Sequence, residues 1–196
     1  MRDADVWKET RRAVLRVVAK RGALLWFMRK GSNMRSLGII SDIHGNRDNL
    51  QAALQDFNDY AVDQALALGD VEYYEVLEEF KESNIKFYCV CGNKDKDPDE
   101  LRKAVVENGG VYCGESGEIE WENHKIFFSH GHIAQLLKDA KYGGEYDVIC
   151  SGHTHIQDKR EDGALLLNPG PAKDGYWIVL IDQNGKLVPV TFPNCN

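Results

Sequence analysis

Five short apolar runs of the chain each end in a polar motif that carries Asp, Asn or His beside glycine. The five polar motifs are Ser41-Asp42-Ile43-His44-Gly45, Gly69-Asp70, Gly92-Asn93-Lys94-Asp95, Ser129-His130-Gly131-His132 and Gly152-His153-Thr154-His155. Ligands bind at the carboxyl ends of the strands in open α/β sheets, so five such strand ends can meet at one edge. Glycine permits the tight turns and the close backbone approach that such an edge requires. The pattern therefore predicts an α/β fold in which the five polar motifs converge.

Strands and helices are expected to alternate in the first half of the chain, and hairpins to dominate the second. Apolar patterning predicts strands at residues 37–41, 64–68, 86–91, 118–121, 125–129, 147–150, 164–167, 177–182 and 187–192. Helices are predicted around residues 50–57, at 73–81, from Pro98 onward and at 133–141. This order of elements predicts a mixed sheet, or two packed sheets, with helices on the outside.

The side chains in the five polar motifs are of the kinds that bind metal ions. The two-residue spacing of Asp42 and His44, and of His153 and His155, keeps each pair on one side of an extended segment. Oxygen and imidazole ligands without a thiolate suit manganese, iron, zinc or nickel. Each motif by itself also occurs in ordinary turns. Because five of the six histidines fall inside these motifs and only His124 does not, the combination favours a metal site.

With all five motifs in this order, the chain resembles the calcineurin-like metallophosphoesterases. More narrowly, it is similar to their small, single-domain bacterial and archaeal phosphodiesterase branch, from about Met34 to Phe192. The resemblance implies a four-layer α/β/β/α sandwich, in which two mixed sheets are flanked by helices. It also implies two divalent metal ions, with Mn²⁺ as the first choice and Ni²⁺, Zn²⁺ or Fe²⁺ as alternatives.

The resemblance further implies a role for each residue of the five polar motifs. Asp42, His44, Asp70 and His155 would hold one metal ion, and Asn93, His130 and His153 the second, with Asp70 bridging both. Two ions ~3.5–4 Å apart would activate a bridging hydroxide for in-line attack on a phosphoester. His132 would lie near the site, and Asp95 would either orient ligands or water or simply cap a turn. The candidate catalytic residues are thus Asp70, Asn93, His132 and Asp95.

Two positions depart from the family pattern. Many phosphatases of the superfamily carry a histidine directly after the asparagine, where it is thought to protonate the leaving group, and this chain has Lys94. The change disfavours a phosphomonoesterase or a protein phosphatase and favours phosphodiesters or activated substrates. Pro171 follows Asn168-Pro169-Gly170, where the family usually has serine, and it tightens that turn.

Other functions remain open at the level of sequence. The same fold resembles the metallophosphoesterase-like subunit of the eukaryotic retromer coat, a protein-binding scaffold whose metal site is eroded. Here all seven ligand positions carry metal-competent residues, which favours an enzyme. A phosphomonoesterase or nucleotidase, a nuclease and a cyclic-nucleotide phosphodiesterase would use the same centre. An added basic or aromatic substrate platform would favour the last two, and the acidic body without a long insertion provides no obvious one. Tyr73 and Tyr74 either stack on a base or are partly buried core residues.

The net charge of −7 is unevenly distributed along the chain. Residues 1–35 contain ten Lys and Arg against three Asp and Glu, so the remaining 161 residues carry a net charge of −14. An acidic body disfavours non-specific binding to nucleic acid, which requires Lys and Arg to neutralise phosphates. The expected partner is a small phosphodiester or a nucleotide-like substrate, and a homo-oligomer stays open.

Residues 1–33 are interpreted as a basic N-terminal extension, and residues 34–196 as the metallophosphoesterase domain. Met34 would make a natural start just before the first strand, so the favoured interpretation is an appended or non-native segment. A helix docked on the domain is the first alternative, and a basic amphipathic helix in contact with a membrane is the least favoured.

The cysteines and the hydropathy pattern predict a reduced, cytoplasmic setting. The five cysteines form an odd set without the paired spacing of a zinc ribbon, and several lie in apolar, strand-like runs. No apolar run approaches the ~18–20 residues that span a bilayer.

Overall fold

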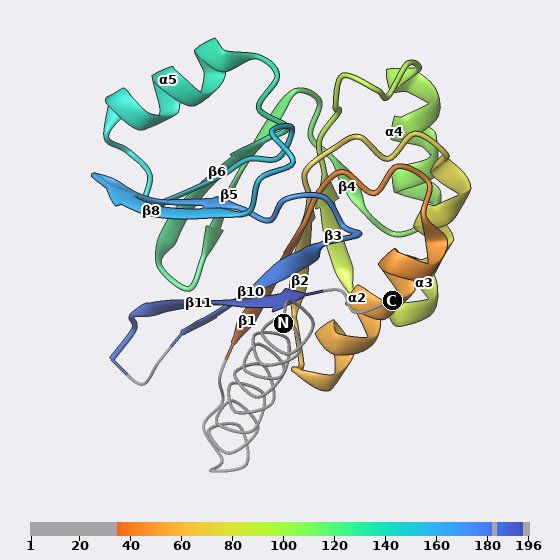
Figure 1. Cartoon of the computed structure of the whole chain (residues 1–196), viewed down its shortest axis with the longest axis horizontal. Helices are drawn as coiled ribbons and strands as arrows, with labels where there is room; N and C mark the ends of the chain where they lie inside the picture. Colours follow the sequence, from red (N-terminus) through yellow and green to blue (C-terminus); the bar gives the residue numbers. More distant parts are fainter. Residues whose placement is uncertain (1–34, 182–183, 194–196) are drawn as a thin grey trace, which may run out of the picture. The chain divides into compact units, whose positions relative to one another are not determined.

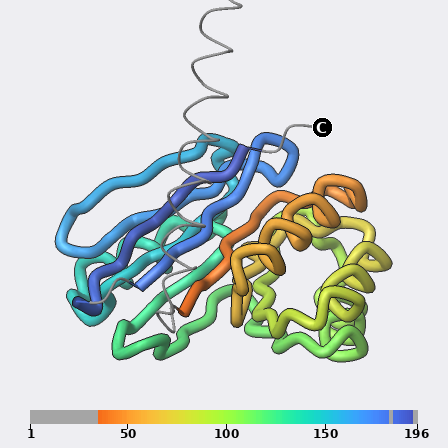
Figure 2. The backbone as a smooth tube through the Cα atoms, turned by 90° about the horizontal axis from the view of Figure 1, so that it is seen from below, coloured from red at the N-terminus to blue at the C-terminus, as the bar shows by residue number. Residues whose placement is uncertain are grey.

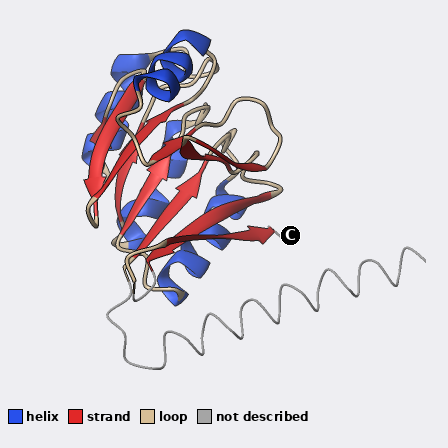
Figure 3. Cartoon of the chain, turned by 90° about the vertical axis from the view of Figure 1, so that its left-hand side faces the viewer, coloured by secondary structure: helices blue, strands red, loops and turns tan. Residues whose placement is uncertain are grey.

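The computed structural model describes residues 35–181 and 184–193, which form two β-sheets packed face to face with helices on their outer sides (Figure 1). Figure 3 shows the strands lying between the helical layers. The predicted α/β sandwich of two mixed sheets flanked by helices is therefore confirmed. The predictions for residues 1–33, for Asp182 at the end of a strand and for Cys195 lie outside the described residues.

The first sheet has six strands in the order β11-β10-β1-β2-β3-β4. Its strands are β1 (Ser36–Ile40), β2 (Gln64–Ala67), β3 (Lys86–Cys89), β4 (Val111–Tyr112), β10 (Gly175–Ile181) and β11 (Leu187–Pro193). The four strands β1 to β4 are parallel, whereas β10 runs antiparallel to β1 and to β11. The carboxyl ends of β1, β2 and β3 therefore lie side by side at one edge of this sheet.

The second sheet has five strands in the order β5-β6-β7-β9-β8. Its strands are β5 (Ser116–Trp121), β6 (His124–Ser129), β7 (Val148–Cys150), β8 (Asp158–Asp162) and β9 (Ala164–Asn168). Strands β6, β7 and β9 are parallel, and the edge strands β5 and β8 are antiparallel to their neighbours. Parallel pairing aligns the carboxyl ends of β6 and β7, as it does those of β1 to β3.

The main core lies between the two sheets. Alternation along β1 turns Leu37 and Ile39 into this core, while Gly38 between them faces α2. A Cβ atom on Gly38 would lie 2.5 Å from the ring of Phe57, so a side chain there would displace that helix. The inner faces of both sheets supply the buried core: Leu37, Ile39, Leu66, Leu68, Val90, Trp121, Ile126, Phe128, Val148, Cys150, Leu167, Trp177 and Val179.

Helices cover the outer face of each sheet. The segments α2 (Arg47–Asp59), η1 (Tyr74–Leu77), α3 (Glu78–Ser83) and α4 (Pro98–Glu107) gather beside the first sheet (Figure 2), and α5 (Ala134–Gly143) packs on the second. Phe80 of α3 stacks on Phe87 of β3 at 4.1 Å between ring centroids. The side chains of Asn46 and Asp97 accept backbone hydrogen bonds at the N-termini of α2 and α4, which fixes where these helices begin.

Three details differ from the sequence prediction. The predicted helix at 73–81 is a 3₁₀ turn, η1, followed by the short helix α3. Strands β4 and β8 were not predicted. Strand β8, Asp158–Asp162, contains no apolar residue and lies at a sheet edge, where backbone pairing with β9 alone defines it. Within the described ranges, no helix is long and apolar enough to cross a membrane.

Candidate metal centre

All five polar motifs follow strand ends and meet where the two sheets adjoin. The motifs follow β1, β2 and β3 in the first sheet and β6 and β7 in the second. Backbone hydrogen bonds link neighbouring motifs, from Asp42 N to Gly69 O at 3.1 Å and from Gly152 N to His130 O at 2.8 Å. The two sheets are joined directly because the His153 N–H donates to Asp42 Oδ2 at 3.2 Å.

Asp42, His44 and His155 form a first cluster of potential ligands, with one donor atom from each within 4.8 Å of the others. Asp42 Oδ1 lies 3.1 Å from His155 Nε2 and 4.0 Å from His44 Nε2. The two imidazole Nε2 atoms are 3.3 Å apart. Asp42 is buried, whereas both histidines have solvent-exposed edges, so the cluster is open on one side.

Asp42, Asp70 and His130 form a second cluster that is buried throughout. His130 Nε2 lies 3.4 Å from Asp70 Oδ1 and 3.1 Å from Asn93 Oδ1. The His153 ring lies beside this cluster, with its centroid 5.2 Å from that of His130. The structure thus brings the seven predicted ligand residues together, and it places Asp42 within reach of both clusters.

His130 is held in one tautomer. Its Nδ1 atom lies 2.7 Å from the carbonyl oxygen of Leu68, which can only accept, so Nδ1 carries the hydrogen. The neutral ring then points its Nε2 lone pair at the oxygens of Asp70 and Asn93. Three acceptors facing one another are stable only when a proton or a metal ion lies between them.

The pKa values of His130 and Asp70 agree with a positive charge held between the two side chains. Burial opposes protonation of His130, but Asp70, the Leu68 carbonyl oxygen and Asp42 together outweigh burial and raise the pKa of His130. For Asp70, burial is outweighed by His130 and by the Lys94 N–H, which donates at 2.8 Å, and the pKa is lowered. Both directions mean that the pair is most stable with one positive charge between the two side chains.

Asp42 gives a second indication that the side chains fit a cation. Its Oδ1 atom is buried and has no hydrogen-bond partner among the described residues, although His155 Nε2 lies 3.1 Å away. A buried carboxylate oxygen without a partner is costly unless a cation neutralises it. The donor set of carboxylate, amide and imidazole therefore fits the predicted divalent ions.

The backbone is strained at the same positions. Five of the seven predicted ligand residues have a left-handed φ: Asp42 (52°), His44 (49°), Asp70 (53°), His153 (67°) and His155 (57°). This conformation costs a non-glycine residue about 1–3 kcal/mol and persists where the surrounding structure enforces it. Such strain clusters at functional sites, and here it aims the ligand side chains inward.

Two glycines leave the space that the carboxylates occupy. A Cβ atom on Gly92 would lie 2.2 Å from Asp70 Oδ1. A Cβ atom on Gly152 would lie 1.9 Å from Ser41 Oγ and 2.8 Å from Asp42 Oδ2. No side chain at either position is compatible with the observed placement of the carboxylates.

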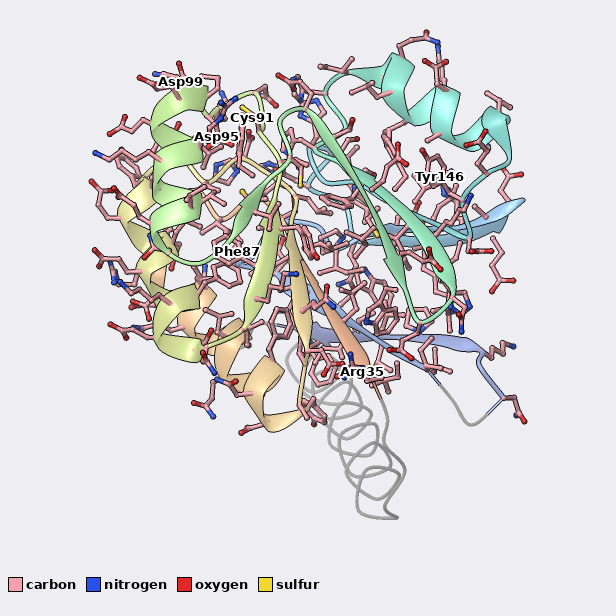
Figure 4. All side chains as sticks on the ribbon, turned by 180° about the vertical axis from the view of Figure 1, so that it is seen from behind. Arg35, Phe87, Cys91, Asp95, Asp99 and Tyr146 are labelled. Carbon is pink, nitrogen blue, oxygen red and sulfur yellow. The ribbon has the colours of Figure 1, made fainter. Side chains whose placement is uncertain are left out.

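Asp95 is buried behind the ligands and connects two of the motifs. Its Oδ2 accepts from the backbone N–H groups of Asp70 at 2.9 Å and Gly92 at 2.8 Å. Its Oδ1 accepts from Val71 and Glu72, both at 2.9 Å. Figure 4 shows it beside Cys91, whose thiol lies 3.7 Å from the Asp95 carbonyl oxygen. Asp95 thus caps its own turn, as one interpretation predicted, and also holds the loop after β2.

His132 and Lys94 lie beside the clusters rather than in them. The His132 ring centroid is 5.5 Å from that of His130, and its Nε2 lies 3.5 Å from Glu115 Oε2. Burial and the neighbouring His130 lower the pKa of His132. The Lys94 side chain is exposed to solvent.

Two residues that hold the ligands in place were missed by the sequence prediction. Glu72 Oε1 lies 3.2 Å from Nδ1 of His44, the nitrogen that faces away from Asp42. The Asn168 side chain donates to Gly152 O at 2.8 Å and to Thr154 Oγ1 at 3.1 Å, which anchors the last motif. The available signals were the spacing of Glu72 two residues after Asp70 and the Asn-Pro-Gly turn.

Comparison with known proteins identifies the family. The model of the calcineurin-like phosphoesterase superfamily domain matches residues 34–178. The chain belongs to the calcineurin-like phosphoesterase superfamily. The predicted resemblance to this superfamily is thereby confirmed, and with it the prediction of an enzyme that hydrolyses phosphoesters.

Relatives of this superfamily member include small archaeal and bacterial proteins. It is 32% identical over 136 residues to Phosphodiesterase MJ0936 of Methanocaldococcus jannaschii, which covers 68% of this chain and 82% of the relative. It is 32% identical over 164 residues to the probable metallophosphoesterase YsnB of Bacillus subtilis, covering 76% and 86%. Phosphodiesterase YfcE of Escherichia coli is 26% identical over 151 residues, covering 70% and 79%.

Solved structures give the same result. A structure described as a novel archaeal phosphodiesterase has a TM-score of 0.70 and 27% identity, over 80% of this chain and 99% of that one. Vacuolar protein sorting 29 from Cryptosporidium parvum has a TM-score of 0.56 and 21% identity, over 82% and 98%. At that identity the second likeness concerns the fold alone, so it carries no argument for a scaffold function.

Proposed function

We propose that this calcineurin-like phosphoesterase is a metal-dependent phosphodiesterase with a binuclear centre. Its ligands would be Asp42, His44, Asp70, Asn93, His130, His153 and His155. The observation that carries the proposal is the pair of clusters that share Asp42. One combines a carboxylate with two imidazoles and the other two carboxylates with one imidazole, and the donor atoms within each lie within 4.8 Å of one another. Two adjacent donor sets support two cation sites, and the named phosphodiesterases among the relatives support a diester substrate.

Two bound divalent ions would supply Lewis-acid activation of water and of the phosphoryl oxygens. Mn²⁺ is the first choice, with Ni²⁺, Zn²⁺ and Fe²⁺ as alternatives, because the donors are oxygen and imidazole nitrogen without thiolate. The resemblance assigns to Asp70 the place between the two sets of ligands, whereas Asp42 is the residue that both clusters share.

The protein's own groups position the reaction. The Leu68 carbonyl oxygen and the Glu72 carboxylate fix the rings of His130 and His44, so their Nε2 atoms face the centre. Asp95 holds the backbone of Asp70 and acts through it rather than by contact with substrate. His132 lies beside His130, with 5.5 Å between the ring centroids. We assign to it a contact with the phosphate group of the substrate.

A phosphodiester is favoured over a phosphomonoester because Lys94 stands where many phosphatases of the superfamily have histidine. A monoester needs a good proton donor for its leaving group, and an exposed lysine is a poor one. Lys94 is suited instead to attract an anionic substrate towards an otherwise acidic domain.

The test compares hydrolysis of bis(4-nitrophenyl) phosphate and 4-nitrophenyl phosphate by the Mn²⁺-loaded protein. We expect a clear preference for the diester, and a monoester preference would overturn the assignment. In Asp70→Asn, kcat/KM for the diester should fall by more than about 100-fold. Loss of a residue that only hydrogen-bonds to a metal ligand typically lowers activity about 10–100-fold, and loss of the ligand itself should cost more. Asp139→Asn, at an exposed position of α5, is the matched control and should leave kcat/KM unchanged. Undiminished turnover in Asp70→Asn would exclude the assigned centre.

We also propose that residues 34–196 form the phosphoesterase domain and that residues 1–33 are an extension. The match to the family model begins at residue 34, which supports this boundary. A chain beginning at Met34 should retain full diesterase activity. A loss of activity on removing residues 1–33 would show that they belong to the domain.

A further inference from the structure

Tyr73 is an exposed aromatic residue beside the candidate metal centre. The residue is 66% exposed, although it follows Glu72, the partner of His44, in the chain. A tyrosine that served only as core would be buried, as Tyr176 is. Exposure of a large ring next to a cluster of potential metal ligands therefore calls for another role.

The position of the Tyr73 ring is set by its contact with the first polar motif. A Cβ atom on Gly45 would lie 2.2 Å from Tyr73 Cδ2, so the ring packs directly on the backbone after His44. The N–H groups of Gly45 and Tyr73 both donate to the Val71 carbonyl oxygen, at 2.8 and 3.0 Å. One carbonyl thus ties the two segments together, and the ring is fixed on one side while the rest faces solvent.

The surroundings of Tyr73 define the kind of group that can bind there. A hollow of about 390 Å³ adjoins the ring, and its lining includes Glu72, Tyr73, Tyr74, Glu78, Glu100 and Lys103. Five glutamates and one lysine border the hollow, so a group with negative charge is repelled there. A flat ring without charge can stack on tyrosine without needing a charged partner.

We propose that Tyr73 is a specificity-determining residue that stacks on an uncharged aromatic ester group of the substrate. This inference rests on the proposed phosphodiesterase function, because the phosphate at the metal centre brings the ester group next to His44. The substrate class is therefore a phosphodiester in which one ester group is a flat aromatic ring, as in an aryl or nucleoside ester. Substrates with further negative charge on that group are disfavoured.

The test uses two diesters that share the 4-nitrophenyl leaving group, phenyl 4-nitrophenyl phosphate and methyl 4-nitrophenyl phosphate. The full-length, Mn²⁺-loaded protein is assayed, and the ratio of kcat/KM for the phenyl over the methyl diester isolates the effect of the second ring. We expect the ratio to fall about tenfold in Tyr73→Ala, because the variant loses one stacked ring. In Tyr73→Phe the ring remains, so the ratio should stay at the wild-type value. A third diester carries a carboxylate on the phenyl ring, and the wild-type protein should not prefer it over the methyl diester.

Tyr142→Ala is the matched control, since Tyr142 is 79% exposed on α5, which packs on the other sheet. It should leave the ratio unchanged. An unchanged ratio in Tyr73→Ala, with the methyl diester still hydrolysed, would overturn the role of Tyr73 and leave the proposed function standing. Failure of the wild type on both diesters would overturn the proposed function as well. An undiminished preference for the carboxylate-bearing ring would overturn the exclusion of charged groups.

Discussion

Nδ1 of His130 lies 2.7 Å from the carbonyl oxygen of Leu68, a residue 62 positions earlier in the chain. The bond crosses from the second sheet to the first, because His130 follows β6 and Leu68 follows β2. It fixes the orientation of the imidazole and connects the two halves of the candidate centre. The centre is therefore part of the packing between the sheets, and metal binding and stability are expected to be coupled.

Removal of metal is expected to destabilise the protein. Without a cation, the buried Asp42 and Asp70 carboxylates repel each other and Asp42 Oδ1 has no hydrogen-bond partner in the described part of the chain. Binding to the folded state alone adds about 2.7 kcal/mol at an ion concentration 100 times Kd. Thermal unfolding after treatment with a chelator should thus show a lower Tm that Mn²⁺ restores. Asp42→Asn should blunt the response to Mn²⁺, and equal Tm values with and without Mn²⁺ would contradict a metal centre.

Asp95→Asn is expected to reduce both stability and activity. The amide places an NH₂ group against backbone N–H donors that now bond to Oδ1 or Oδ2, so at least one buried donor loses its acceptor. A buried donor without a partner costs about 1–3 kcal/mol. Urea denaturation should show a loss of this size, together with a fall in kcat caused by displacement of Asp70. Asp139→Asn serves as control, and wild-type stability in Asp95→Asn would mean that the four bonds matter little.

Glu72→Gln should weaken metal binding without unfolding the protein. The neutral amide is a weaker partner for Nδ1 of His44, which lies 3.2 Å from Glu72 Oε1. Loss of such a carboxylate partner typically lowers metal affinity about 10–100-fold. Titration with Mn²⁺, followed by activity and by calorimetry, measures the change. The matched control is Glu75→Gln, an exposed glutamate three residues later, and a similar affinity in both variants would refute a role for Glu72.

The thiols of Cys89, Cys91 and Cys150 should resist modification at pH 8 in the native protein. Burial is the main reason that the pKa of Cys91 is raised to about 11, and burial raises the pKa of Cys89 and Cys150 as well. Only the thiolate reacts, so labelling should accelerate as the pH rises towards 11. The raised pKa contributes stability that is present below pH 9 and is lost as the pH rises through about 11. Peptide mapping after timed alkylation, with denatured protein as reference, measures each site, and rapid native labelling of Cys91 at pH 8 would contradict its burial.

Much of the fold was predictable because its information is local. After Ser36, strand β1 is a continuous apolar run, and the parallel pairing of β1 with β2 and of β2 with β3 follows from the alternation of strands and helices. The exceptions have physical reasons. Strand β8 is polar throughout and exists through backbone pairing at a sheet edge, and the segment from Tyr74 to Ser83 changes helix type after one turn. Neither feature leaves a hydrophobic period in the sequence.

The amino-acid sequence alone determined which residue types stand at five strand ends. The carboxyl ends of strands in α/β sheets converge regardless of which side chains they carry. Only the tertiary structure decided which atoms face one another: Nε2 of His130 towards Asp70, Glu72 towards His44, and Asp95 towards four backbone N–H groups. These contacts depend on left-handed backbone at residues such as Asp42 and Asp70, a conformation that local propensity disfavours. The packing of two sheets enforces that conformation, and such packing has no counterpart in any short stretch of sequence.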